Sequence, residues 1–174
     1  STTVAVHGFG KVGSVAAQEI YKLNTKVVAI SDVSGGLYNK KGLDIPDLLE
    51  YFAEHRTLAG YTQGDKLTNE ELLALPVDVL IPAAIDGVIT KENVGSVKAK
   101  IIAEGANGPI TSEALNELEA RNVFIIPDIL CNAGGVIVSY FEWVQGIQNF
   151  FWNEKEVNEK LAEVASFLRF MSGL

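Results

Sequence analysis

Three glycines, at Gly8, Gly10 and Gly13, are the residues whose types and spacing point most directly to chemistry. They follow the apolar run of residues 4–7 and open a helical pattern. In that context the first glycine allows a tight turn, the second lets the backbone approach a pyrophosphate, and the third lets the helix pack close to the strand. The N-terminus of the helix would offer free N–H groups to the phosphates. The pattern predicts a dinucleotide-binding loop; the alternative is a tight strand-to-helix turn without a ligand.

A second element of such a site is an acidic residue at the end of the next strand. Asp32 fills that place, 19 residues after Gly13. Its carboxylate can accept a hydrogen bond from a ribose hydroxyl and should repel the 2′-phosphate of NADP, which favours NAD. Lys40 and Lys41 could fold back toward the same place and admit NADP. The alternative is an aspartate that only stabilises the turn in "SDVSGG".

The elements that must position these residues alternate between short apolar runs and helical segments. The predicted strands are Thr3–His7, Lys26–Ser31, Val77–Pro82, Lys100–Ala103 and Val123–Ile126. The predicted helices lie near 11–23, 46–56, 69–75, 90–96 and 111–121. This alternation predicts an α/β fold: a three-layer, Rossmann-type, doubly wound and mostly parallel sheet with helices on both faces.

Local signals mark some boundaries of these elements. Thr68 and Glu71 have the spacing of a capping box, Thr90 and Thr111 are candidate N-caps, and Asn122 is a candidate helix stop. Residues 57–67 are predicted to form a surface loop. Beyond residue 131 the pattern predicts two long C-terminal helices with a break near Asn153, so we divide the chain into a Rossmann domain, 1–152, and a terminal helix, 153–174.

Composition excludes several classes of function. The chain has 174 residues and a net charge of −8, with no Lys/Arg-rich run, which argues against a nucleic-acid partner. Its one cysteine, Cys131, allows no intrachain disulfide or cysteine zinc cluster, and no metal site is expected. No apolar run is long enough to span a membrane, so we expect a cytoplasmic protein. The chain begins at Ser1 without an initiator Met, which indicates a fragment, a processed chain or an engineered one.

The ends of the later strands carry small and polar residues. They read "PAAIDG", "EGANGP" and "PDILCNAGGV", and ligands of parallel sheets bind at such ends. The amides of Asn107 and Asn132 could each contact a nicotinamide carboxamide or its ribose. A turn or helix-cap role is the alternative for both asparagines.

The stretch "NAGGVIVSYFEW" adds a resemblance to a known family. Together with "GFGKVG", "SDVSGG", "PAA" and "AEGANGP", in order and spacing, it resembles the cofactor domain of a glutamate dehydrogenase, from the hexameric Glu/Leu/Phe/Val dehydrogenases, over about residues 3–163. The resemblance implies NAD as cofactor, with NADP possible. It implies cofactor contacts from Gly8, Phe9, Gly10, Lys11, Val12, Gly13, Asp32, Val33, Ala83, Ala84, Asn107 and Asn132. It places Val136 and Ser139 in the substrate pocket, where Ser139 would bind the γ-carboxylate of glutamate.

The same resemblance implies that the reaction needs a second domain. In the family a lysine and an aspartate of the substrate domain do the proton chemistry, and their motifs are not found here, so no catalytic residue is assigned in this chain. We expect an isolated cofactor domain that binds NAD(P) with little or no turnover. The full-length enzyme would be a homohexamer that interconverts glutamate and 2-oxoglutarate. The last residues, 164–174, depart from the family pattern.

Other functions remain open at this point. The chain could be the cofactor domain of another amino-acid dehydrogenase, or a complete small oxidoreductase that forms its active site between subunits. It could also be a non-enzymatic Rossmann module that senses NAD. The glycine loop alone would equally accept FAD or S-adenosylmethionine, although the later loops favour nicotinamide.

Overall fold

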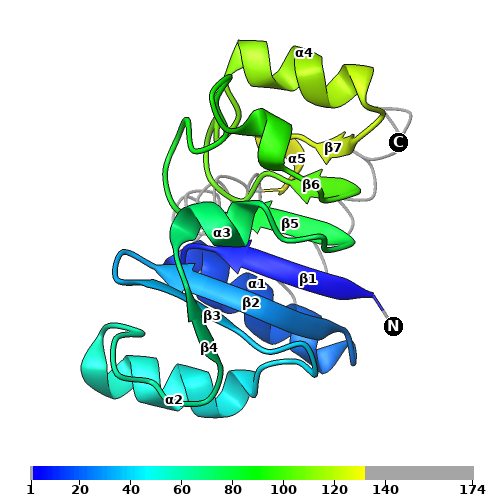
Figure 1. The fold of residues 1–174 in the computed structure, drawn as a ribbon. Helices are drawn as coiled ribbons and strands as arrows, with labels where there is room; N and C mark the ends of the chain where they lie inside the picture. The colour runs from blue at the N-terminus through cyan, green and yellow to red at the C-terminus, as the bar shows by residue number, and fades with distance from the viewer. Residues whose placement is uncertain (1, 132–174) are drawn as a thin grey trace, which may run out of the picture. The chain divides into compact units, whose positions relative to one another are not determined.

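A seven-stranded sheet is the framework of the computed structural model, which describes residues 2–131 (Figure 1). The chain divides into two units, Ser1–Ile126 and Pro127–Leu174, and the whole sheet belongs to the first. The strands are β1 (Thr3–His7), β2 (Lys26–Asp32), β3 (Gly35–Tyr38), β4 (Asp65–Leu67), β5 (Val79–Pro82), β6 (Ile101–Ala103) and β7 (Phe124–Ile126). All five predicted strands are present, with bounds within two residues of those expected.

The order of the sheet is β4-β3-β2-β1-β5-β6-β7. Strands β2, β1, β5, β6 and β7 are parallel, while β3 runs antiparallel to both of its neighbours. The chain moves from β1 to β2 on one side and later returns to β5 on the other side of β1. The mostly parallel, Rossmann-type fold is therefore confirmed. Its topological switch point lies at β1, where such folds bind ligands beyond the carboxyl ends.

Strands β3 and β4 are not predicted from the sequence, and β4 corrects the expectation of a loop over 57–67. Neither strand shows apolar alternation: β3 begins with two glycines, and β4 has three residues at the sheet edge. Gly36 lies close to β4: a Cβ on it would lie 2.5 Å from Cδ1 of Leu67, so that side chain would have to move aside. Two side chains of the supposed surface loop, Leu58 and Tyr61, are buried in the core.

The helices are α1 (Lys11–Lys22), α2 (Ile45–His55), α3 (Asn69–Leu73), α4 (Ser112–Ala120) and, in the second unit, α5 (Asp128–Cys131). The capping box of α3 is confirmed: the Glu71 N–H donates to Thr68 Oγ1 at 3.1 Å, and the Thr68 N–H donates to Glu71 Oε2 at 2.7 Å. Thr111 caps α4, and Asn122 follows that helix with a left-handed φ of 56°.

The helix predicted over 90–96 is wrong. Only a 3-10 turn, η1 (Val94–Ser96), forms there. The Asn93 side chain accepts from the Thr90 N–H at 2.8 Å and donates to the Val88 carbonyl at 2.8 Å. These bonds hold a turn that starts at Thr90, whose carbonyl accepts from the Val94 N–H at 2.9 Å, and the low helical preference of Gly95 disfavours extension into a regular helix.

Two apolar layers hold the helices against the sheet. One layer joins Val4 and Val6 of β1 to side chains of α1 and α2, such as Ala17 and Leu48. The other joins Ala5 of β1 to side chains of α3 and α4. Because successive residues of a strand face opposite sides, β1 contributes to both layers and is buried on both faces. The carboxyl ends of β1, β2 and β5 are thus held by packing on each side.

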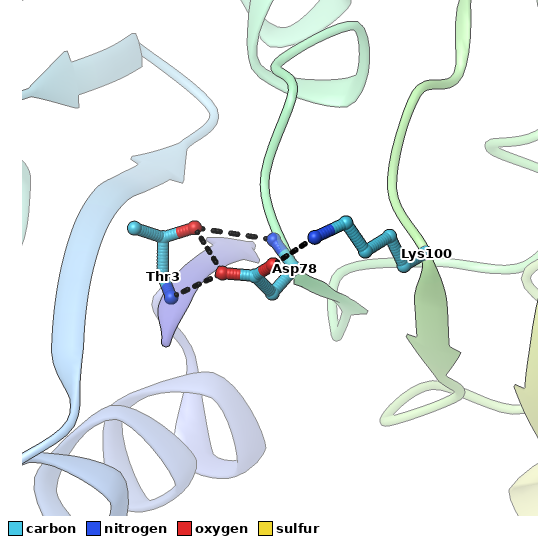
Figure 2. Close-up of polar contacts among 3 residues, drawn as sticks. All are labelled: Thr3, Asp78 and Lys100. Atoms are coloured by element: carbon cyan, nitrogen blue, oxygen red, sulfur yellow. Dashed lines mark hydrogen bonds and ion pairs between the residues drawn. The ribbon is translucent and has the colours of Figure 1, made fainter. Parts of the chain in front are cut away.

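A polar cluster ties the strands together at the opposite, amino edge of the sheet (Figure 2). Asp78, just before β5, accepts from the Thr3 N–H at 2.9 Å and from the Thr3 hydroxyl at 3.0 Å. Its own N–H donates to Thr3 Oγ1 at 3.1 Å, and Lys100 Nζ lies 2.7 Å from its second oxygen. The cluster therefore fixes the starts of β1 and β5 and the residue before β6.

Candidate functional site

A groove of about 510 Å³ lies at the carboxyl ends of β1, β2 and β5. Seven of the predicted cofactor residues line it: Gly8, Phe9, Gly10, Asp32, Val33, Ala83 and Ala84. Phe9 is almost fully buried and packs edge-on against Phe52, at a ring-centroid distance of 5.0 Å, so it forms the base of the groove. The groove thus brings together predicted residues from the three loops that follow β1, β2 and β5.

The three glycines of the loop meet different surroundings. Gly8 has a φ of +100°, and a Cβ on it would lie 2.7 Å from the Ala84 backbone nitrogen. Gly13 packs so closely that a Cβ would lie 1.8 Å from the Gly8 carbonyl oxygen. In the described part of the chain, Gly10 has no heavy atom within 4 Å of its Cβ position. Two glycines are therefore required by the fold, whereas Gly10 leaves open space beside the backbone.

Helix α1 begins at this open space. Its N-cap is Gly10, which has no side chain to bond the first-turn N–H groups, and no acidic residue lies in that turn. Lys11 and Val12 open the helix and are exposed, and neither lines the groove. The N–H groups that the first turn of a helix leaves unpaired, with the positive end of the helix dipole, form a binding place for an anion.

Asp32 lines the groove and also holds its own loop. Its Oδ1 accepts from the Ser34 N–H at 2.7 Å and from the Ser34 hydroxyl at 2.5 Å, and its Oδ2 accepts from the Leu58 N–H at 2.7 Å. Burial acts to raise the pKa of Asp32, but the hydrogen bonds from Ser34, Leu58 and Thr57 outweigh it and lower that pKa. The turn role and the ligand role proposed for Asp32 are therefore compatible, because a carboxylate has about four acceptor positions.

Apolar side chains flank the outer part of the groove. Val33 is fully exposed and Ile85 is 66% exposed, and both line it. They come from the loops after β2 and β5. Exposed branched side chains on facing loops suit a flat, partly apolar ring between them.

Several lining residues were not predicted from the sequence, chiefly His7, Asn69 and Glu70. His7 ends β1, is 7% exposed, and its Nδ1 has no hydrogen-bond partner among the described residues. Asn69 Nδ2 donates to the Asp32 carbonyl at 3.1 Å, which brings α3 to the end of β2. A signal was present: α3 starts after a capping box, and a helix crossing between the halves of the sheet must start near the carboxyl edge of β1.

Lys41 lies elsewhere, which corrects the expectation that it could reach Asp32. It lines a separate cavity with Lys26, the first residue of β2, whereas Asp32 is the last residue of that strand. Among the described residues, the positively charged side chain that lines the groove is that of Arg56, the C-cap of α2, whose backbone is left-handed. The sequence analysis did not predict that this guanidinium shares the groove with Asp32.

The remaining predicted residues lie apart from the groove or outside the described part. Asn107 is exposed on the loop after β6 and does not line the groove. That loop is joined to the loop after β5 by a hydrogen bond from the Gly87 N–H to the Gly108 carbonyl, at 2.9 Å, and to the last residue of β5 by one from the Ala106 N–H to the Pro82 carbonyl, at 2.9 Å. Asn132, Val136 and Ser139 lie outside residues 2–131, as do the predicted C-terminal helices.

A search of residues 2–131 finds no cluster of three or more histidine, cysteine, aspartate or glutamate side chains arranged to hold a metal ion. No helix in the same range is long and apolar enough to cross a membrane.

Known proteins resemble the chain over nearly all of its length. Residues 1–170 match the family model described as Glutamate/Leucine/Phenylalanine/Valine dehydrogenase. The chain is 52% identical to a glutamate dehydrogenase of Thermotoga maritima, over 93% of this chain and 39% of that protein. It is 50% identical to an NADP-specific glutamate dehydrogenase of Synechocystis, over 94% of this chain and 40% of that protein.

Solved structures agree with these sequence matches. A hetero-hexameric glutamate dehydrogenase from Thermus thermophilus, in its Leu-bound form, superposes with a TM-score of 0.88 at 33% identity, over 95% of this chain and 39% of that one. Glutamate dehydrogenase from Peptoniphilus asaccharolyticus gives a TM-score of 0.77 at 36% identity, over 95% and 38% of the two chains. The chain thus spans about two fifths of the length of the relatives it matches.

Proposed function

The chain belongs to the Glutamate/Leucine/Phenylalanine/Valine dehydrogenase family, and on that premise we propose that residues 1–152 are the NAD(P)-binding domain of a glutamate dehydrogenase. The whole enzyme would convert L-glutamate, NAD(P) and water to 2-oxoglutarate, ammonia and NAD(P)H, as a homohexamer. The chain itself would bind cofactor with little or no turnover, because the resemblance assigns the catalytic lysine and aspartate to the substrate domain.

The observation that carries this proposal is the open space beside Gly10. A Cβ at Gly10 would have no heavy atom of residues 2–131 within 4 Å, although Gly8 and Gly13 on either side are closely packed. The same space adjoins the uncapped start of α1, where N–H groups are available to an anion. A pyrophosphate fits both conditions, and the residues present therefore fit a dinucleotide.

Each part of the groove would then have a defined role. The α1 N-terminus and the backbone at Gly10 would hold the pyrophosphate, and Asp32 would accept a hydrogen bond from the adenosine ribose. Val33 and Ile85 would pack on the two faces of the adenine ring. When bound, the nicotinamide ring supplies a carbon that accepts hydride from the substrate.

The nicotinamide and substrate ends of the site remain proposals from the sequence. Ala83, Ala84, Asn107 and Asn132 would orient the nicotinamide half, and Val136 and Ser139 would contact the glutamate side chain. Among the two cofactors, we propose NAD, because the ionised Asp32 carboxylate lines the groove. The Synechocystis relative is named as NADP-specific, so the choice between NAD and NADP needs a measurement.

A titration of the purified chain with NADH tests the proposal. Trp143 and Trp152 provide intrinsic fluorescence, which bound reduced nicotinamide would quench by energy transfer. We expect saturable quenching that 5′-AMP reverses by competition, and no turnover of glutamate with NAD. A folded chain that shows no saturable binding, by this assay or by calorimetry, would contradict the proposal.

A further inference from the structure

Two side chains at one end of the groove have no part in the site proposed so far. His7 ends β1, and Glu70 lies in the first turn of α3; both line the groove. Neighbouring Asn69 bonds the Asp32 carbonyl, so Glu70 belongs to the same end of the groove as Asp32. If the dinucleotide binds as proposed, this is the end that receives the adenosine ribose.

The charges at this end are unbalanced. Among the described residues that line the groove, two carboxylates, Asp32 and Glu70, face one guanidinium, that of Arg56. Bonds from its own N–H and from Thr68 lower the pKa of Glu70, which keeps it ionised. Both oxygens of Asp32 already accept bonds from Ser34 and Leu58, which offset part of its charge. Glu70 therefore adds a second negative charge to the end of the groove where Asp32 lies.

His7 does not neutralise Glu70. The ring is 7% exposed, and burial lowers its pKa more than the charge of Glu70 raises it. A neutral ring brings no positive charge to the Glu70 carboxylate. Among the described residues the His7 Nδ1 has no hydrogen-bond partner, and a buried polar group without a partner is costly unless a ligand or water supplies one.

We propose that Glu70 and His7 are specificity residues at the adenosine end of the groove, where Glu70 repels a 2′-phosphate and His7 hydrogen-bonds the adenosine. The inference rests on the proposed function and narrows it. The ligand would be a dinucleotide with a free 2′-hydroxyl, and Asp32 would not be the sole determinant of that choice. Arg56, exposed at the groove, is the opposing charge that would favour a phosphate.

Two small ligands that lack nicotinamide isolate this end of the groove: 5′-AMP and 2′,5′-ADP, which differ by the 2′-phosphate. Calorimetry would give the affinity of the chain for each, for wild type and Glu70→Gln. In wild type, the Glu70 carboxylate would repel the doubly charged 2′-phosphate across a few ångströms of partly exposed groove. We therefore expect Glu70→Gln to lower the ratio of 5′-AMP affinity to 2′,5′-ADP affinity by about fivefold to tenfold. Glu50→Gln, an equal charge change on the exposed part of α2, should leave the ratio unchanged.

His7 has a different expected signature. His7→Phe removes the ring nitrogens at similar size and should weaken both ligands by a similar factor, about threefold to tenfold for one hydrogen bond. His7→Gln, which keeps a donor and an acceptor, should restore part of that affinity. Thermal melts of each variant would verify that the chain is folded.

The outcomes separate this inference from the proposed function. If wild type binds NADH and 5′-AMP but Glu70→Gln leaves the ligand ratio at the wild-type value, the specificity role of Glu70 is refuted and the cofactor domain stands. If a folded His7→Phe binds both ligands as wild type does, the role of His7 is refuted. If folded wild type binds neither NADH nor 5′-AMP, the proposed function fails, and the inference fails with it.

Discussion

The different surroundings of Gly10 and Gly13 predict that cofactor binding and folding can be separated by two single substitutions. Gly10→Val places methyl groups in open space, at a residue whose φ of −81° any amino acid adopts. Valine is a poorer N-cap than glycine, so we expect the free energy of unfolding to fall by about 1 kcal/mol or less. Gly13→Ala places a Cβ 1.8 Å from the Gly8 carbonyl oxygen, against backbone.

The expected losses follow from these distances. The clash at residue 13 has to be relieved by moving α1 or the turn by more than an ångström, and we expect a cost of roughly 3 kcal/mol or more. At residue 10 the valine would displace a pyrophosphate that accepts two or more charge-assisted bonds, each contributing about 1.5–3 kcal/mol. A loss of about 3 kcal/mol corresponds to roughly a hundredfold weaker binding.

Urea denaturation and NADH calorimetry on the same preparations measure both quantities. Gly10→Val should unfold near the wild-type midpoint and bind NADH at least about a hundredfold more weakly. Gly13→Ala should unfold at a much lower urea concentration. Retention of NADH affinity within tenfold by a folded Gly10→Val variant would show that the loop is only a turn. A Gly13→Ala variant as stable as wild type would refute the close packing of α1.

Three further predictions concern single side chains. In the same calorimetric assay, Asp32→Ala should weaken NADH binding and lower the ratio of NADH affinity to NADPH affinity. Asp32→Asn should separate the loss of the charge from the loss of the hydrogen bonds that Asp32 makes within its loop. Unchanged affinity for both cofactors would show that Asp32 is not part of the site. Thr68→Ala breaks the capping box with Glu71 and should lower the free energy of unfolding by about 1 kcal/mol without changing NADH affinity, whereas an unchanged urea midpoint would mean that α3 is held by packing alone. The bonds from Lys100 and Thr3 hold the pKa of Asp78 well below its ordinary value of 3.8, so the ionised carboxylate stabilises the fold above pH 3.8 and loses this contribution as the pH falls further. Asp78→Asn should therefore have a lower free energy of unfolding than wild type at neutral pH. If the difference between the two proteins did not shrink toward about pH 3, this explanation would be wrong.

The sequence predicts the position of an element best where one local pattern is sufficient to specify it. β1 and the capping box of α3 match their expected residues because a short apolar run and a Thr-x-x-Glu spacing specify them without help from distant contacts. β3 and β4 depend on each other: Gly36 of β3 pairs with Leu67 of β4, and neither strand has a periodic pattern of its own. Pairing between weak strands is a tertiary outcome.

The residues of the candidate site also fall into two groups, those that a local motif predicts and those that tertiary packing brings to the groove. Residues within the glycine loop and at strand ends, such as Gly10 and Asp32, follow from motif spacing. His7 and Glu70 join the groove because α3 crosses over β1 and β2, and nothing near them in the sequence marks a ligand contact. The helix expected over 90–96 does not extend beyond a turn at Thr90 and a 3-10 turn, and the low helical preference of Gly95 contributes to this local failure.

The amino-edge cluster of Figure 2 has a consequence for the order in which the molecule folds. Thr3 and Asp78 are 75 residues apart, and their bonds can form only after that long loop has closed. The entropy of closing this loop is lost before a contact of such long sequence separation contributes, so the pairing that this cluster completes slows folding. Disrupting the cluster should accelerate unfolding if its bonds form after the rate-limiting step, and slow refolding if they form before it. The unfolding and refolding rates of Asp78→Asn, compared with wild type, would therefore place the connection between β1 and β5 in the order of folding.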